Sequence, residues 1–94
     1  MHIEEIVWLD GIVEKLWRKH GVDTYEVVEV LENRPKFRFV EKGFRSGEDM
    51  YLALGRTEAG RYLSVFFVYK SDRRALIISA RGSTASEKDR YERK

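Results

Sequence analysis

The chain has 94 residues, which is enough for one domain with a single hydrophobic core. It contains no cysteine, which excludes a disulfide scaffold and cysteine catalysis and is typical of a reducing compartment. We expect a cytoplasmic protein without a membrane span, because its first residues are acidic and its longest apolar run is short. The net charge is only +2.

The first helix is predicted within the sequence "LDGIVEKLWRKHGV". Asp10 is positioned to be its N-cap, and Gly21 is positioned to end it in a left-handed conformation. The apolar residues recur with helical spacing, which predicts one buried stripe along the helix. This stripe comprises Ile12, Val13, Leu16 and Trp17, and it is extended by His20.

The second helix has clearer start and stop signals. Asp23 is expected to cap it, and Glu26 at the third helical position is expected to close a capping box. Val22 can pack on Val27 as a hydrophobic staple. The helix should end at "ENRP", because the residue before Pro35 is disfavoured in helical conformation.

Strands are predicted in the rest of the chain, up to a short terminal helix. The expected strands are residues 36–40, 50–57, 62–70 and 75–81. The third of them is apolar almost throughout, which is typical of a central strand. Their short connections favour an antiparallel meander, and Ile6–Trp8 is a candidate additional strand.

The chain returns to helix after the last strand. Thr84 and Glu87 have the spacing of a second capping box, and the helix that they begin has almost no apolar face. The predicted class is α+β, with two N-terminal helices, a three- to four-stranded antiparallel sheet and a short C-terminal helix. We expect residues 1–94 to form a single domain, with the helices gathered on one face of the sheet.

His20 is the histidine that lies inside a predicted element. Its ordinary pKa would suit general acid–base catalysis near neutral pH. A structural role is the alternative, because an imidazole at a helix C-terminus interacts favourably with the helix dipole and this one also continues the apolar stripe. The sequence has no paired ligand spacing such as "HExxH" and no phosphate-binding glycine loop, so we expect neither a metal nor a cofactor.

Positive charge is concentrated in the second half of the chain. Residues 1–34 contain four Lys/Arg against eight Asp/Glu, whereas residues 70–94 contain eight against four. This distribution is compatible with a bound polyanion, although a solvated charged surface would look the same. Candidate phosphate-binding and stacking residues are Arg45, Arg56, Arg61, Arg81, Tyr69 and Tyr91.

Arg81 has the most informative position of these candidates. It follows the apolar run "ALIIS" and precedes a helix N-terminus, which is itself a favourable place for an anion. Arg56 and Arg61 flank the turn "TEAG" and could be solvated charges, an alternative that explains Arg56 equally well. Glu87 is most simply a helix cap and secondarily a catalytic carboxylate.

An ordered series of motifs resembles the BrnT family of bacterial toxins. Trp8 opens it, "KHGV" follows at residues 19–22, and the second helix starts around Tyr25. "GEDMYLALG", "GRYLSV" and finally "IISAR…E…Y" at residues 77–91 complete the series. The series covers nearly the whole chain, and "KHGV" and "IISAR…E…Y" are specific when they occur together.

The resemblance implies a RelE-like fold and a small metal-independent endoribonuclease that inhibits translation. It also implies neutralisation by a ribbon-helix-helix antitoxin encoded beside the toxin. In such sites cations hold the scissile phosphate, while a basic or aromatic side chain assists attack by the 2′-hydroxyl. The catalytic candidates carried over to this chain are Lys19, His20, Arg61, Arg81, Glu87 and Tyr91. Those expected to bind RNA are Arg45, Arg56 and Tyr69.

The chain also departs from the BrnT pattern, which identifies it as a divergent member. BrnT-like chains usually begin with Trp-Asp-Pro, followed by a lysine and an asparagine in the first helix, and here Leu9, Ile12 and Leu16 stand in those places. Gly82 stands where a second arginine is usual. A non-catalytic RNA- or protein-binding module on the same fold is therefore the alternative function. A homodimer is a further expectation, based on the strand aromatics Phe37, Phe39, Phe44, Phe66 and Phe67.

Overall fold

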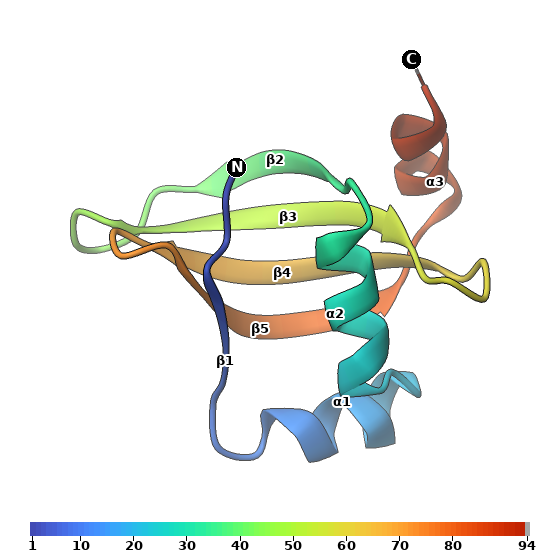
Figure 1. Cartoon of the computed structure of the whole chain (residues 1–94), viewed down its shortest axis with the longest axis horizontal. Helices are drawn as coiled ribbons and strands as arrows, with labels where there is room; N and C mark the ends of the chain where they lie inside the picture. Colours follow the sequence, from blue (N-terminus) through green and yellow to red (C-terminus); the bar gives the residue numbers. More distant parts are fainter. Residues whose placement is uncertain (94) are drawn as a thin grey trace.

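The computed structural model describes residues 1–93. The elements follow one another as β1 (Glu5–Trp8), α1 (Ile12–His20), α2 (Thr24–Glu32), β2 (Lys36–Glu41), β3 (Glu48–Arg56), β4 (Tyr62–Lys70), β5 (Arg74–Gly82) and α3 (Ala85–Glu92) (Figure 1). The α+β class and all four longer strands expected from the sequence are confirmed. No helix within residues 1–93 combines the length and the apolar character that crossing a bilayer requires.

The sheet has five strands in the order β1-β5-β4-β3-β2. Strands β2 to β5 form the expected antiparallel meander, with the apolar strand β4 at its centre. The expectation of three or four antiparallel strands is wrong at the other edge, because β1 pairs in parallel with β5. Trp8 lies opposite Ile77 in this pairing, so the first strand of the chain extends a sheet that is completed some 70 residues later.

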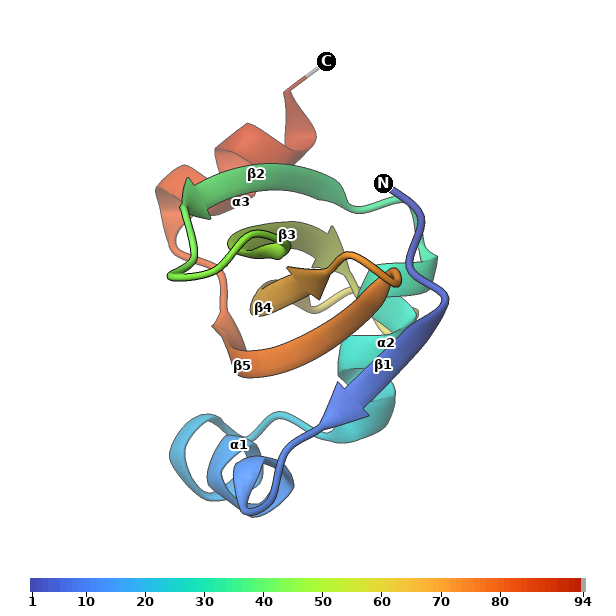
Figure 2. The ribbon, with the colours of Figure 1, turned by 90° about the vertical axis from the view of Figure 1, so that its left-hand side faces the viewer.

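The helices lie on both faces of the sheet. Leu63, Val65 and Phe67 alternate along β4 and join the core residues of α1 and α2, such as Leu16 and Val27, all almost fully buried. The residues between them on β4 point to the opposite face, where α3 lies (Figures 1 and 2). The expectation that all helices gather on one face is therefore wrong, because α3 has no buried residue and cannot share the core.

Helix α1 begins later than its sequence signals predict. Its N-cap is Gly11 in a left-handed conformation (φ 77°) rather than Asp10, because a tight turn places Asp10 outside the helix. The predicted stripe is correct at Ile12 and Leu16, which are buried. It is wrong at Val13 and Trp17, since their side of the helix does not contact the core and Trp17 is 62% exposed.

The local signals at the other helix ends are confirmed. Gly21 ends α1 in the left-handed region, with φ 61°. Asp23 and Glu26 form the capping box that starts α2. Thr84 and Glu87 form the one that starts α3. These short-range motifs fix where the helices begin, and the last of them also shapes the candidate site.

Candidate functional site

The candidate site lies where β5 ends and α3 begins. Arg81 pairs with Ser64 of the neighbouring strand β4, so both side chains project from the face of the sheet that lies away from α1 and α2. The chain leaves β5 at Gly82 and starts α3 three residues later. This short connection brings Glu87, in the first turn of the helix, over the end of the strand.

Four hydrogen-bond donors converge on the Glu87 carboxylate. The Arg81 guanidinium donates through Nη1 to Oε1 at 2.7 Å and through Nη2 to Oε2 at 2.9 Å. The Ser64 hydroxyl donates to Oε1 at 2.8 Å, and the backbone N–H of Thr84 donates to the same oxygen at 2.9 Å. Ser64 is completely buried, and its only hydroxyl proton is donated to Glu87. The Ser83 hydroxyl, 2.8 Å away, therefore donates to the Ser64 oxygen.

The electrostatics of this cluster keep the pair ionised. The hydrogen bonds from Arg81 lower the pKa of Glu87 to about 2, and those from Thr84 and Ser64 act in the same direction against the effect of burial. The same bond raises the pKa of the Arg81 guanidinium. Glu87 is therefore a carboxylate at neutral pH and is poorly suited to be a general acid there.

The stability of the protein should depend on Glu87 in acid. Its pKa is depressed below the usual 4.5, so the stabilisation is complete above pH 4.5 and is lost as the pH falls toward 2. We expect the free energy of unfolding to fall by about 3 kcal/mol across this window from this group. Denaturant titrations from pH 5 to pH 2 measure it, and Glu87→Gln should lack this component. Identical pH dependence in the two proteins would contradict this prediction.

A groove of about 230 Å³ runs beside the Arg81–Glu87 pair. Phe66 and Leu52 lie on its sheet side, Arg38 of β2 is exposed at its rim, and Glu87 also lines it. The Arg81 guanidinium lies over the Phe66 ring at 5.4 Å from the centroid. The groove thus has an aromatic surface, one arginine and a carboxylate in its lining, and Arg81 lies beside it against Phe66 and Glu87. This combination suits a planar anionic ligand such as a nucleotide.

Tyr62 holds α3 against the sheet next to this groove. The Arg56 guanidinium lies 5.0 Å and the Lys88 ammonium 4.6 Å from the centre of its ring. Its ring also contacts Tyr91 edge to face, and its hydroxyl donates to Glu92. Arg56 and Tyr91 from the expected site are therefore brought near Arg81 and Glu87, and Lys88 adds a cation to them.

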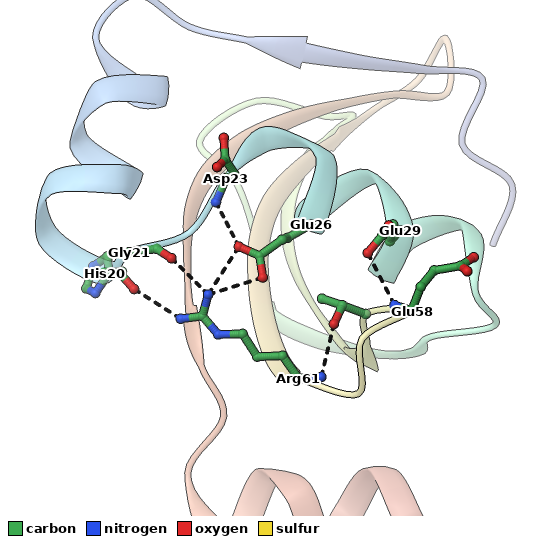
Figure 3. Close-up of polar contacts among 8 residues, drawn as sticks. His20, Gly21, Asp23, Glu26, Glu29, Glu58 and Arg61 are labelled. Carbon is green, nitrogen blue, oxygen red and sulfur yellow. Dashed lines mark hydrogen bonds and ion pairs between the residues drawn. The ribbon is translucent and has the colours of Figure 1, made fainter.

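Arg61 lies instead in the corner between α1 and α2 (Figure 3). Its guanidinium donates to the carbonyl of His20 at 3.2 Å, to the carbonyl of Gly21 at 2.8 Å and to both carboxylate oxygens of Glu26 at 3.1 and 3.2 Å. These partners occupy the donors that would otherwise bind phosphate. His20 meets Arg61 through its backbone, and Lys19 is exposed on the last turn of α1.

Arg45 and Tyr69 lie toward the other end of the sheet. Tyr69 is the eighth residue of β4 and donates its hydroxyl to the carbonyl of His2. Arg45 is exposed in the connection between β2 and β3. Tyr69 is five positions from Ser64 along the strand, about 17 Å away, so it does not converge with Arg81.

The structure adds residues that the sequence reasoning missed, namely Ser64, Arg38, Tyr62 and Lys88. Ser64 had a detectable signal, because a hydroxyl inside an apolar central strand must find a partner. Within residues 1–93 no three carboxylate or histidine groups are arranged to hold a metal ion. Of the strand aromatics expected at a dimer interface, Phe67 is buried and Phe39 and Phe44 are exposed.

Comparisons with known proteins agree with this architecture. The family model described as "Ribonuclease toxin, BrnT, of type II toxin-antitoxin system" matches residues 8–87. Among solved structures, the chain is similar to the 1.1 Å crystal structure of the Brucella abortus ribonuclease toxin BrnT, with a TM-score of 0.61 and 18% sequence identity. The alignment covers 85% of this chain and 96% of that one, and at this identity it shows the fold alone. A search of curated proteins found no match.

Proposed function

The chain belongs to the BrnT family of ribonuclease toxins of type II toxin–antitoxin systems, and we propose that it is a metal-independent endoribonuclease that inhibits translation. Its proposed place of action is the cytoplasm. Its proposed partners are RNA and a ribbon-helix-helix antitoxin that neutralises it. The observation that carries the proposal is the cationic end of the sheet, where Arg81 is fixed beside a groove of about 230 Å³.

The proposed reaction is transesterification within the RNA backbone. The 2′-oxygen forms a bond to phosphorus as the bond to the 5′-oxygen breaks, which gives a 2′,3′-cyclic phosphate and a free 5′-hydroxyl. The proton leaves the 2′-hydroxyl, and another proton is delivered to the departing 5′-oxygen. Negative charge develops on the phosphoryl oxygens, and a guanidinium that donates through two nitrogens is suited to stabilise it.

The geometry supports a division of the expected site residues into two groups. We assign phosphate and base contacts to Arg81, which lies over Phe66 beside the groove, and to Arg56 and Tyr91, which contact Tyr62 next to α3. Lys19 and His20 belong to α1, on the other face of the sheet from Arg81, so we do not assign them proton transfer at the Arg81 phosphate. The other expected residues receive different tasks. Arg61 positions α1 and α2, Glu87 binds the Arg81 guanidinium, and Arg45 and Tyr69 can contact a longer RNA only outside the groove.

A specific observation also favours the non-catalytic alternative. Arg81 is neutralised by Glu87, and Gly82 adds no second cation beside it. A module that binds RNA without cutting it would show affinity that weakens steeply with salt and no cleavage products. The absence of cleavage therefore separates the two functions.

Expression of the chain alone should arrest bacterial growth, because cutting RNA stops translation. Co-expression of the ribbon-helix-helix protein encoded next to it should restore growth. Growth curves after induction, with the protein quantified in the soluble fraction, are the measurement. Normal growth in the presence of abundant folded protein would contradict the toxin assignment.

A further inference from the structure

We propose that the Glu87 carboxylate is an internal ligand that fills the phosphate site of the resting protein, and that an RNA phosphate must displace it. This inference rests on the proposed function, because it concerns the same Arg81 guanidinium. It makes Glu87 a competitor of the substrate rather than a catalytic residue. The protein would then hold its own phosphate site closed until RNA arrives.

The donors around Glu87 form a site for an oxyanion. A two-pronged guanidinium, a buried hydroxyl and a backbone N–H all point at one carboxylate, and all four hydrogen bonds are between 2.7 and 2.9 Å long. The same kinds of donor bind phosphate oxygens, and the planar fork of arginine fits either anion. The backbone N–H belongs to the N-cap of α3, where the helix dipole adds to the attraction.

The site does not depend on Glu87 for its shape. Arg81 also lies over the Phe66 ring and donates to the carbonyl of Gly82 at 3.2 Å. Ser64 is fixed within the central strand β4 and accepts a hydrogen bond from Ser83. The guanidinium and the hydroxyl therefore stay in place when the carboxylate leaves.

Glu87 can leave without unfolding its helix. It belongs to α3, which has no buried residue, so rotation of one side chain is sufficient. The Thr84 hydroxyl would still accept the hydrogen bond from the Glu87 backbone N–H, at 3.1 Å, and Tyr62 would still hold the helix through Lys88 and Tyr91. Displacement thus exchanges one anion for another.

Glu87→Gln should increase the affinity for phosphate, because it removes the competing charge while keeping a side chain that can close the capping box. We expect inorganic phosphate, and a DNA oligonucleotide that lacks the attacking 2′-hydroxyl, to bind at least about tenfold more tightly. NMR titration that follows the Thr84 amide and the Arg81 guanidinium measures both affinities. Glu92→Gln on the same helix is the charge-matched control and should change them little.

Glu87→Ala provides a second variant without the competing charge and should bind more tightly as well. Adding Arg81→Ala to Glu87→Gln should abolish the gain. Equal affinities for wild-type protein and both Glu87 variants, each folded by its amide spectrum, would overturn the inference. Tighter binding without RNA cleavage by any variant would support it and reject the ribonuclease function. Cleavage by the wild-type protein, with no increase in phosphate affinity in either Glu87 variant, would support the ribonuclease function and overturn the inference about Glu87.

Discussion

Arg81→Ala should reduce RNA cleavage at least about a hundredfold for each folded molecule. The guanidinium is the cation fixed at the groove through Phe66 and Glu87, and alanine removes both of its prongs. Arg81→Lys should recover only part of the activity, because an ammonium keeps the charge but not the two parallel hydrogen bonds. Cleavage of a labelled RNA measures the effect.

The control for this variant is Arg18→Ala. Arg18 is an exposed arginine of α1 that pairs with Glu14. Its removal changes the net charge by the same amount as Arg81→Ala but at a position far from the groove. It should leave cleavage unchanged. Equal loss of activity in the two variants would indicate that total charge, rather than the fixed position of Arg81, governs the reaction.

Arg61→Ala should lower the free energy of unfolding by about 3 kcal/mol. The substitution leaves the Glu26 carboxylate, which is only 13% exposed, without its cation and removes the donor to the last carbonyls of α1. Denaturant unfolding measures the loss. Cleavage by the remaining folded protein should stay close to that of wild type, because Arg61 positions the helices and does not contact the groove.

Arg18→Ala is again the reference, because both side chains of the Arg18–Glu14 ion pair are exposed and the pair stabilises the fold by at most about 0.5 kcal/mol. Unchanged stability of Arg61→Ala together with lost activity would contradict the structural role. It would return Arg61 to the catalytic set that the sequence suggests. The two arginine variants therefore separate phosphate binding from helix positioning.

The parts of the fold that depend on local sequence could be predicted. Capping boxes and the left-handed Gly21 involve residues a few positions apart, and the apolar run of β4 identifies the central strand. The parallel pairing of β1 with β5 could not be predicted from local patterns, because it joins residues about 70 positions apart. Likewise, the exposure of Trp17 depends on which side of α1 packs against the sheet. The helical spacing of apolar residues does not determine that side.

The site was partly predictable for the same reason. Arg81 and Glu87 are six residues apart across one turn, so their pairing follows from the strand end and the capping box. From the sequence, Arg61 is as plausible a phosphate-binding residue as Arg81. Only the packing of α1 and α2 shows that its hydrogen-bond donors are occupied. Ser64 becomes a site residue because strand register places it opposite Arg81.

Incubation of the purified wild-type chain with RNA in excess EDTA tests the central claim most directly. The proposed mechanism predicts internal cuts that carry 2′,3′-cyclic phosphates and 5′-hydroxyl ends, and these cuts should disappear with Arg81→Ala. Intact RNA with the folded wild-type protein, or cuts that survive in Arg81→Ala, would contradict it.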